Sequence, residues 1–157
     1  MNSVLLVAVV VVAVVIIVVK RFLGEPLNAR DLAVPPLVLV GIGIYTLTRV
    51  GELSGSEIGW ILAGSTVGLA LGAIRGTTVR LFTRGGVLWQ RYSGWTVGVW
   101  VVSFAISAGL GYLATRAGVR EEARPLTLSI GVSLLGELAT LGKRALSTGV
   151  PFAPDRR

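Results

Sequence analysis

The sequence lacks cysteine and histidine altogether, and only 15% of its 157 residues are charged. Without those two residue types the chain has no disulfides, no thiol nucleophile, no zinc site with nitrogen and sulfur ligands, and no ordinary haem ligation. A soluble domain carries about 25% charged residues, whereas 53% of this chain is hydrophobic. The composition therefore predicts an integral membrane protein, and we expect neither a metal site nor a cofactor.

Basic residues outnumber acidic ones, and the formal net charge is +7 at pH 7. They are scattered between apolar segments rather than gathered in one stretch, whereas a nucleic-acid-binding surface would concentrate them. We therefore expect no nucleic-acid partner and interpret the arginines as topology signals.

The segment from Ser3 to Val19 has no charge, and 14 of its 17 residues are Val, Leu or Ile. At roughly −0.3 to −0.6 kcal/mol per residue, these side chains favour insertion by about −4 to −8 kcal/mol. Lys20 and Arg21 follow it, which is typical of an anchor with an outside N-terminus rather than of a signal peptide. Four further segments approach the ~20 residues that cross a hydrocarbon core. The predicted spans are 3–19, 32–48, 57–74, 94–115 and 126–142.

The basic residues are distributed unevenly between the two sides of these spans. The loops after the first and third spans and the C-terminal tail hold eleven of the fifteen, and the other side holds four. Cytoplasmic loops carry the excess of lysine and arginine. We therefore expect a multi-pass protein of the bacterial cytoplasmic membrane, with its N-terminus outside and its C-terminus in the cytoplasm.

The predicted fold class is an all-α membrane protein: one domain, residues 1–157, folded as a five-span helix bundle with a short cytoplasmic β-hairpin between spans three and four. Pro35 and Pro36 are expected in the first turn or two of the second span, where a missing N–H costs least. Glycines recur at every fourth position from Gly64 to Gly76, and a similar stripe of small residues runs from Gly94 to Gly111. Small residues let membrane helices approach closely, so we expect both stripes to pack within the bundle or to form a homodimer seam.

Glu137 is the only carboxylate well inside a predicted span, and an intramembrane ionisable group is a functional candidate by default. Four small or polar residues share its helical face within about a 100° arc: Ser129, Ser133, Gly136 and Thr140. This face is expected to point into protein. Two interpretations stay open: Glu137 is a buried structural group, protonated or paired with an arginine, or it is a proton or substrate site like the lone carboxylate of small multidrug exporters.

Glu52, Glu57 and Asp31 are further catalytic candidates, because paired carboxylates can do acid and base work. Each also has a structural interpretation. Ser54 or Ser56 is expected to cap the third span, with Glu57 in its first turn, and Asp31 is expected to cap the second span.

Residues 77–91 are not membrane-like, and the adjacent glycines at 85 and 86 lie between two β-prone runs, which predicts a two-residue hairpin turn. In the register that this turn fixes, Thr83 faces Leu88, Phe82 faces Trp89 and Arg80 faces Arg91. The aromatic pair favours that register, whereas two opposed arginines require an anionic headgroup or a partner between them.

The predicted lipid or partner contacts are therefore Arg80, Arg84, Trp89 and Arg91. An isolated two-stranded hairpin is marginal in water. We expect this one to lie against the membrane surface, the bundle or another chain, either as a structural lid or as a docking element.

These features together resemble the CcdC-like bacterial membrane proteins. The resemblance rests on a first anchor followed by Lys20 and Arg21, on the proline pair that opens the second span, and on a hairpin between Arg75 and Arg91 that leads into the fourth. It covers most of the chain. The family takes its name from cytochrome c maturation loci, and the resemblance implies a membrane location without implying any catalytic residue.

Three functional hypotheses follow. The first is an inner-membrane accessory or scaffold protein without redox or metal chemistry, in contact with lipids and with a protein partner or a second copy. The second is a membrane-embedded enzyme that uses the carboxylates in acid catalysis on a lipid-like or prenyl substrate. The third is a small dimeric proton-coupled transporter built around Glu137. A cavity lined by carboxylates and aromatics would favour the enzyme, and Glu137 facing its own copy would favour the transporter.

Overall fold

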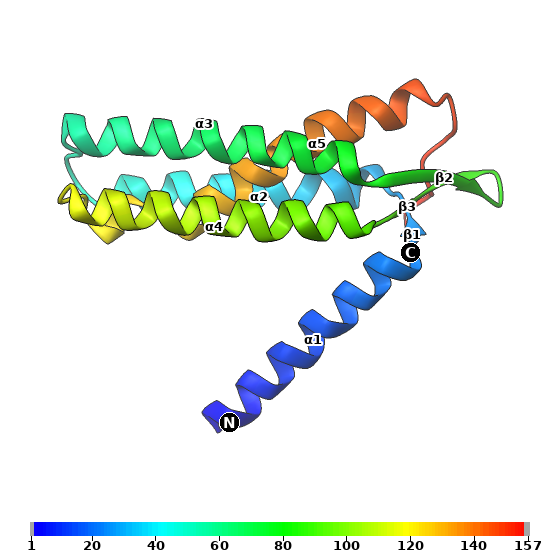
Figure 1. The fold of residues 1–157 in the computed structure, drawn as a ribbon, viewed down its shortest axis with the longest axis horizontal. Coiled ribbons are helices and arrows are strands. Elements are labelled where there is room, and N and C mark those ends of the chain that lie inside the picture. The colour runs from blue at the N-terminus through cyan, green and yellow to red at the C-terminus, as the bar shows by residue number, and fades with distance from the viewer. Residues whose placement is uncertain (1, 156–157) are drawn as a thin grey trace.

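The structure, a computed structural model, describes residues 2–155, apart from the side chains at positions 3, 6, 7, 10 and 14. This part of the chain forms five long helices, a short 3₁₀ helix η1 (Glu121–Ala123) and a small sheet. The long helices are α1 (Ser3–Leu23), α2 (Ala29–Arg49), α3 (Gly55–Thr78), α4 (Gly94–Arg116) and α5 (Leu126–Ser147). Figure 1 shows α2 to α5 side by side as a bundle, with the sheet at one end and α1 splayed away from it.

Four helical segments of the described chain are long and apolar enough to cross a membrane: Ala29–Arg49, Gly55–Thr78, Gly94–Arg116 and Glu121–Ser147. They contain the last four predicted spans, which supports a helical membrane protein. The structure supports four spans rather than the five predicted, because α1, which holds the predicted span 3–19, is not among these four. Helix α1 has its main contact with β3 of the sheet, and five of its side chains lie outside the described residues.

Helix α2 begins three residues earlier than predicted, because Asn28 caps it. The Asn28 Oδ1 accepts hydrogen bonds from the backbone N–H groups of Arg30, at 2.8 Å, and Asp31, at 3.2 Å. The prediction that Asp31 is the cap is therefore wrong, and Asp31 instead lies in the first turn, where its charge favours the helix dipole. The earlier start also places Pro35 and Pro36 inside the helix, beyond the positions where a missing N–H is free of cost.

Helix α5 is the central element of the bundle, since it packs along both α2 and α3. Its contact with α3 is close because glycines line both helices. A Cβ atom on Gly72 of α3 would collide with the Ser133 carbonyl oxygen, and one on Gly136 of α5 would collide with the Leu69 carbonyl oxygen. Such backbone approach is how small residues bring membrane helices together.

The glycine stripe of α3 therefore packs within the bundle, as expected, but on α5. Gly76 also lies against α5, at Thr140, whereas Gly64 has open space around its Cα. In the small-residue stripe of α4, Gly94 and Gly98 have open space as well. The two stripes do not interlock at these glycines, and a homodimer seam along α4 stays a prediction.

The sheet has the strand order β1-β3-β2, with β1 (Glu25–Pro26), β2 (Arg80–Arg84) and β3 (Val87–Arg91) all antiparallel to their neighbours. The predicted hairpin and its register are confirmed, since Thr83 pairs with Leu88, Phe82 with Trp89 and Arg80 with Arg91. Both turn glycines have positive φ, +60° and +76°, which is the requirement of a type I′ turn.

The hairpin is held by contacts with other parts of its own chain. The Leu27 N–H donates to the Leu88 carbonyl at 2.8 Å, and the Leu88 N–H donates to the Pro151 carbonyl of the C-terminal tail at 2.9 Å. Leu27 and Leu88 form a small core with Ala145 of α5. The tail returns to β1 through the Ala153 N–H, which donates to the Leu27 carbonyl at 2.9 Å. Neither β1 nor this tail was predicted from the sequence.

Candidate functional site

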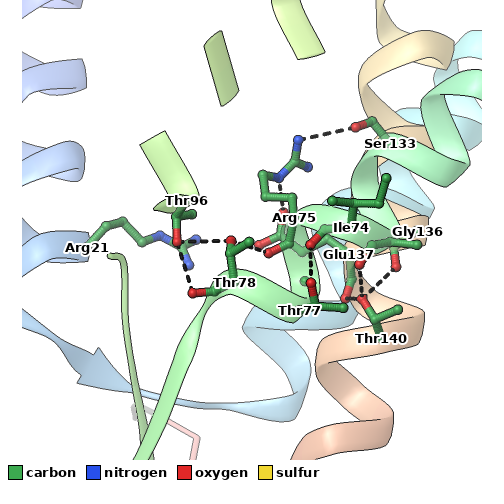
Figure 2. Close-up of polar contacts among 12 residues, drawn as sticks. Arg21, Ile74, Arg75, Thr77, Thr78, Thr96, Ser133, Gly136, Glu137 and Thr140 are labelled. Atoms are coloured by element: carbon green, nitrogen blue, oxygen red, sulfur yellow. Dashed lines mark hydrogen bonds and ion pairs between the residues drawn. The ribbon is translucent and has the colours of Figure 1, made fainter. Parts of the chain in front are cut away.

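Glu137 lies inside the bundle and forms an ion pair with Arg75. The Arg75 Nε donates to the Glu137 Oε2 at 2.6 Å, and the two side chains are only 2% and 6% exposed. Figure 2 shows Arg75 reaching from α3 to Glu137 and to Ser133 of α5. The polar face predicted for this helix thus points into protein at Glu137. The structural interpretation had two forms, a protonated carboxyl group and a carboxylate paired with an arginine, and the geometry is that of the pair.

Arg75 is fixed by two further contacts. Its Nη1 donates to the Ser133 hydroxyl at 3.3 Å, and its guanidinium carbon lies 4.2 Å from the centre of the Trp100 ring of α4. A cation over an aromatic face gains electrostatic energy, more so where water is excluded. Three helices therefore meet at Arg75, which we interpreted from the sequence as a loop residue and topology signal. The correction has a physical reason: a carboxylate within a span needs a cation nearby.

Tyr92, between β3 and α4, lies beside this pair at the sheet end of the bundle. Burial raises the pKa of its phenol above the usual value, and the Glu137 carboxylate raises that pKa further, while Arg21 and Arg75 oppose the shift. Arg21 lies over the Tyr92 ring, 5.4 Å from its centre. The phenol is therefore neutral at physiological pH.

Glu57 has a structural role at the opposite end of the bundle. Of the two caps considered from the sequence, Ser54 and Ser56, the structure has Ser54. It forms a capping box with Glu57: the Ser54 N–H donates to the Glu57 Oε2 at 2.9 Å, and the Glu57 N–H donates to the Ser54 hydroxyl at 3.2 Å. Arg120 adds two hydrogen bonds to the same carboxylate, at 2.7 and 2.9 Å, and the pairing raises the pKa of Arg120. Arg120 also donates to the Glu52 carbonyl at 3.0 Å. The carboxylate is thus fully used in joining two loops.

The four carboxylates that were catalytic candidates do not form one site. Glu52 and Glu57 precede or begin α3, while Asp31 and Glu137 belong to the half of the bundle nearer the sheet. In residues 2–155 no group of three or more Asp and Glu side chains comes together. Of these four carboxylates only Asp31 lines any of the described cavities, where the second carboxylate is Glu25 rather than another of the candidates.

The predicted contact residues of the hairpin do share a face. Alternate residues of β2 and their partners on β3 bring Arg80, Phe82 and Arg84 beside Arg91 and Trp89. Phe82 and Trp89 lie with ring centres 6.1 Å apart, and the Arg84 guanidinium carbon is 5.0 Å from the Trp89 ring centre. The three arginines are exposed. The other face of the hairpin carries Leu88 into the small core.

Arg144, counted as a tail residue from the sequence, lies in α5 and closes the end of α3. Its Nη1 donates to the carbonyls of Gly76, at 2.7 Å, and Val79, at 2.8 Å. A cation at this position satisfies carbonyls that the helix leaves unpaired and complements its dipole. Arg75 and Arg144 are therefore structural residues that the count of basic loop residues missed.

No protein-family model matches this chain, and neither a curated protein nor a solved structure matches it. The resemblance to the CcdC-like proteins stays a prediction.

Proposed function

We propose that this chain is an accessory or scaffold protein of a bacterial cytoplasmic membrane, and that it presents the arginine-bearing face of its sheet to a cytoplasmic partner with an acidic surface. The proposal rests on one contrast between bundle and sheet. The buried carboxylates Glu57 and Glu137 each pair with an arginine. On the hairpin, Arg80, Arg84 and Arg91 form no ion pair with any described residue.

The shape of the sheet supports a partner outside the membrane. Figure 1 shows the β2–β3 turn projecting beyond the helix ends, away from the bundle. The hairpin face combines aromatic and arginine side chains, the residue types that dominate binding energy at protein interfaces. Because Arg80 and Arg91 lie directly opposite each other, an anionic group between them relieves their repulsion. An acidic surface is the complement that fits.

The same geometry weighs against the two competing hypotheses. An acid-catalysed enzyme needs carboxylates around a common cavity, and here the four candidates are separated, with Glu57 and Glu137 each engaged in an ion pair. A proton-coupled transporter built on Glu137 needs a carboxylate that exchanges its proton, whereas this one accepts a hydrogen bond from a buried guanidinium. Neither hypothesis has a specific observation in its favour.

The orientation and the role of α1 belong to the proposal. With Arg75 and Arg144 removed from the count of eleven, nine basic residues remain on the side of the sheet against four on the other, so the positive-inside rule still favours a cytoplasmic sheet. We propose that α1 crosses the membrane as well, because its large apolar side chains among the described residues, such as Val9 and Ile17, are exposed. A cysteine introduced at Asn2 is then labelled from outside the cell; labelling only after permeabilisation contradicts a crossing by α1.

Crosslinking in cells tests the docking face. The variant Arg80→Glu/Arg91→Glu reverses two charges on the sheet, and the matched control Arg30→Glu/Lys143→Glu reverses two exposed charges at the same end of the bundle. We expect the first variant to lose the crosslinked protein partners of the wild type while the second retains them. Equal retention by both variants contradicts the proposed docking face.

A further inference from the structure

A cavity of about 200 Å³ lies between α3, α4 and α5, in the half of the bundle away from the sheet. Along α3 it extends over the twelve residues from Trp60 to Leu71, about 16 Å of helix. This is about half of the ~30 Å thickness of a hydrocarbon core. The cavity therefore has the length of one leaflet.

The cavity is unusual in its serines. Five serine side chains line it, in a wall that also contains leucine, valine and glycine: Ser65, Ser103, Ser107, Ser129 and Ser133. Only Ser133 has a hydrogen-bond partner among the described residues, and that partner is Arg75. Ser103 is only 7% exposed, and its hydroxyl has no hydrogen-bond partner in the described part of the chain. A buried hydroxyl left unpaired costs free energy. The position of the Ser103 hydroxyl in the cavity wall therefore indicates a ligand with a polar group.

Arg124 lines the same cavity at the end that is farther from the sheet. Its Nη1 donates to the Gly111 carbonyl and its Nη2 to the Thr115 hydroxyl, both at 2.9 Å, whereas its Nε is buried without a partner among the described residues. In residues 2–155 no carboxylate lies within ion-pair distance of Arg124, in contrast to Arg120, which Glu57 neutralises. This end of the cavity therefore carries a positive charge and an unpaired hydrogen-bond donor.

The side of the cavity between α4 and α5 gives access from the bilayer. Helix α5 packs along α2 and α3, and α4 packs on α3, but the described residues show no comparable packing of α4 on α5. Apolar side chains line the interior, including Leu71, Leu110 and Leu128. A lipid acyl chain that enters from the side of the bundle thus meets apolar walls, serine hydroxyls and one arginine at the level of the headgroups.

We propose that this cavity binds one anionic phospholipid of the leaflet opposite the sheet, with its phosphate at Arg124, its ester carbonyls toward the serine hydroxyls and one acyl chain between α3, α4 and α5. The charge at Arg124 selects an anionic headgroup, and the length of the cavity fits a chain of one leaflet. Ser107 lies about one helical turn, or about 6 Å, from Gly111 toward the middle of the membrane. Because Arg124 bonds to the Gly111 carbonyl, this depth suits the ester groups of a lipid whose phosphate lies at Arg124. This site is separate from the hairpin face and does not depend on it.

Native mass spectrometry of the purified full chain tests the site, with phosphatidylglycerol and phosphatidylcholine of equal chain length as probes. We expect the wild type to bind phosphatidylglycerol about tenfold more tightly than phosphatidylcholine, because both lipids offer a phosphate to Arg124 but the choline group adds a cation that repels it. Arg124→Gln should lose this preference, and Arg116→Gln, an exposed arginine outside the cavity, should retain it. Equal binding of both lipids by the wild type, or equal loss in both variants, overturns the proposal.

A second pair of variants tests the cavity itself. Gly64 lines it and has open space for a side chain, while Gly59 on the same helix has open space but does not line it. Gly64→Leu should fill the cavity and lower phosphatidylglycerol binding about tenfold, with Gly59→Leu unchanged and both proteins folded by circular dichroism. Undiminished binding by folded Gly64→Leu would mean that the lipid lies elsewhere.

Discussion

Arg75 and Glu137, 62 residues apart in the chain, form a 2.6 Å ion pair between α3 and α5 in which both side chains are almost completely buried. The pair lies where glycines bring the two helices closest, since Gly72 and Gly76 of α3 contact the same stretch of α5. It also holds α4 through Trp100. A single buried contact thus joins three of the four bundle helices.

Removing one member of this pair should destabilise the protein strongly. Glu137→Gln leaves the Arg75 guanidinium buried without its counter-charge, and such a change costs about 3–5 kcal/mol. We expect a lower midpoint of thermal unfolding in detergent, while Glu121→Gln, at an exposed position, should leave it unchanged. The double variant Arg75→Met/Glu137→Leu should recover much of the loss, because apolar replacement of a whole buried pair is often neutral. A Glu137→Gln protein as stable as the wild type contradicts a structural pair.

The close contact between α3 and α5 leads to a prediction about glycines on one helix. Gly72→Ala forces a methyl group against the Ser133 carbonyl oxygen and should cost about 1–3 kcal/mol through overpacking. Gly64→Ala, eight residues earlier in the same stripe, meets open space and should have little effect. Unfolding in a denaturing detergent measures the difference, and equal stability of the two variants would show that α5 does not cover Gly72.

At the opposite end of the bundle, Glu57 and Glu52 provide a matched comparison. Glu57→Gln weakens the capping box and the bond to Arg120, and we expect a small loss of stability, since Arg120 is half exposed and its attraction is screened. Glu52→Gln should be neutral, because Arg120 uses only the Glu52 backbone carbonyl. Hydrogen exchange should accelerate at residues 54–58 in the first variant alone. Protection that stays the same at these amides would contradict the pairing.

The Asn28 side chain has two structural roles, which a single substitution can separate. Its Oδ1 caps α2, and its Nδ2 donates to the Ala153 carbonyl at 3.1 Å and to the Asp155 carboxylate at 2.8 Å. Asn28→Asp keeps the cap but loses both donors and repels Asp155. We expect faster hydrogen exchange at the Leu88 amide, which bonds to Pro151 of the tail, with unchanged exchange at Arg30. Unchanged exchange at Leu88 would show that Asn28 does not hold the tail.

The elements that could be predicted from the sequence are those with a strong local signal. Long apolar runs located four of the helices that are long enough to cross a membrane, and the glycine pair at 85 and 86 fixed the hairpin register, because a two-residue turn determines which residues face each other. The cap at Ser54 with Glu57 was likewise readable from spacing. These features depend on residues close together in the chain.

The elements that sequence reasoning missed depend on distant residues. The two-residue strand β1 and the C-terminal tail have no periodicity, and their pairing with β3 is decided by tertiary contacts. Arg75 follows an apolar segment, which is the pattern of a loop cation. Only the packing of α5 on α3 brings Glu137 to it. Small residues on α3, α4 and α5 show that helices pack closely, but not which ones do.

The most direct test of the whole account is single-cysteine labelling, which the cysteine-free chain makes simple. Thr83→Cys marks the sheet, and Ala117→Cys marks the loop after α4; both positions are exposed and lie at opposite ends of the bundle. A membrane-impermeant maleimide should label Ala117→Cys in intact cells and Thr83→Cys only after permeabilisation. Labelling of both positions from the same side would contradict a bundle that crosses the membrane with its sheet in the cytoplasm.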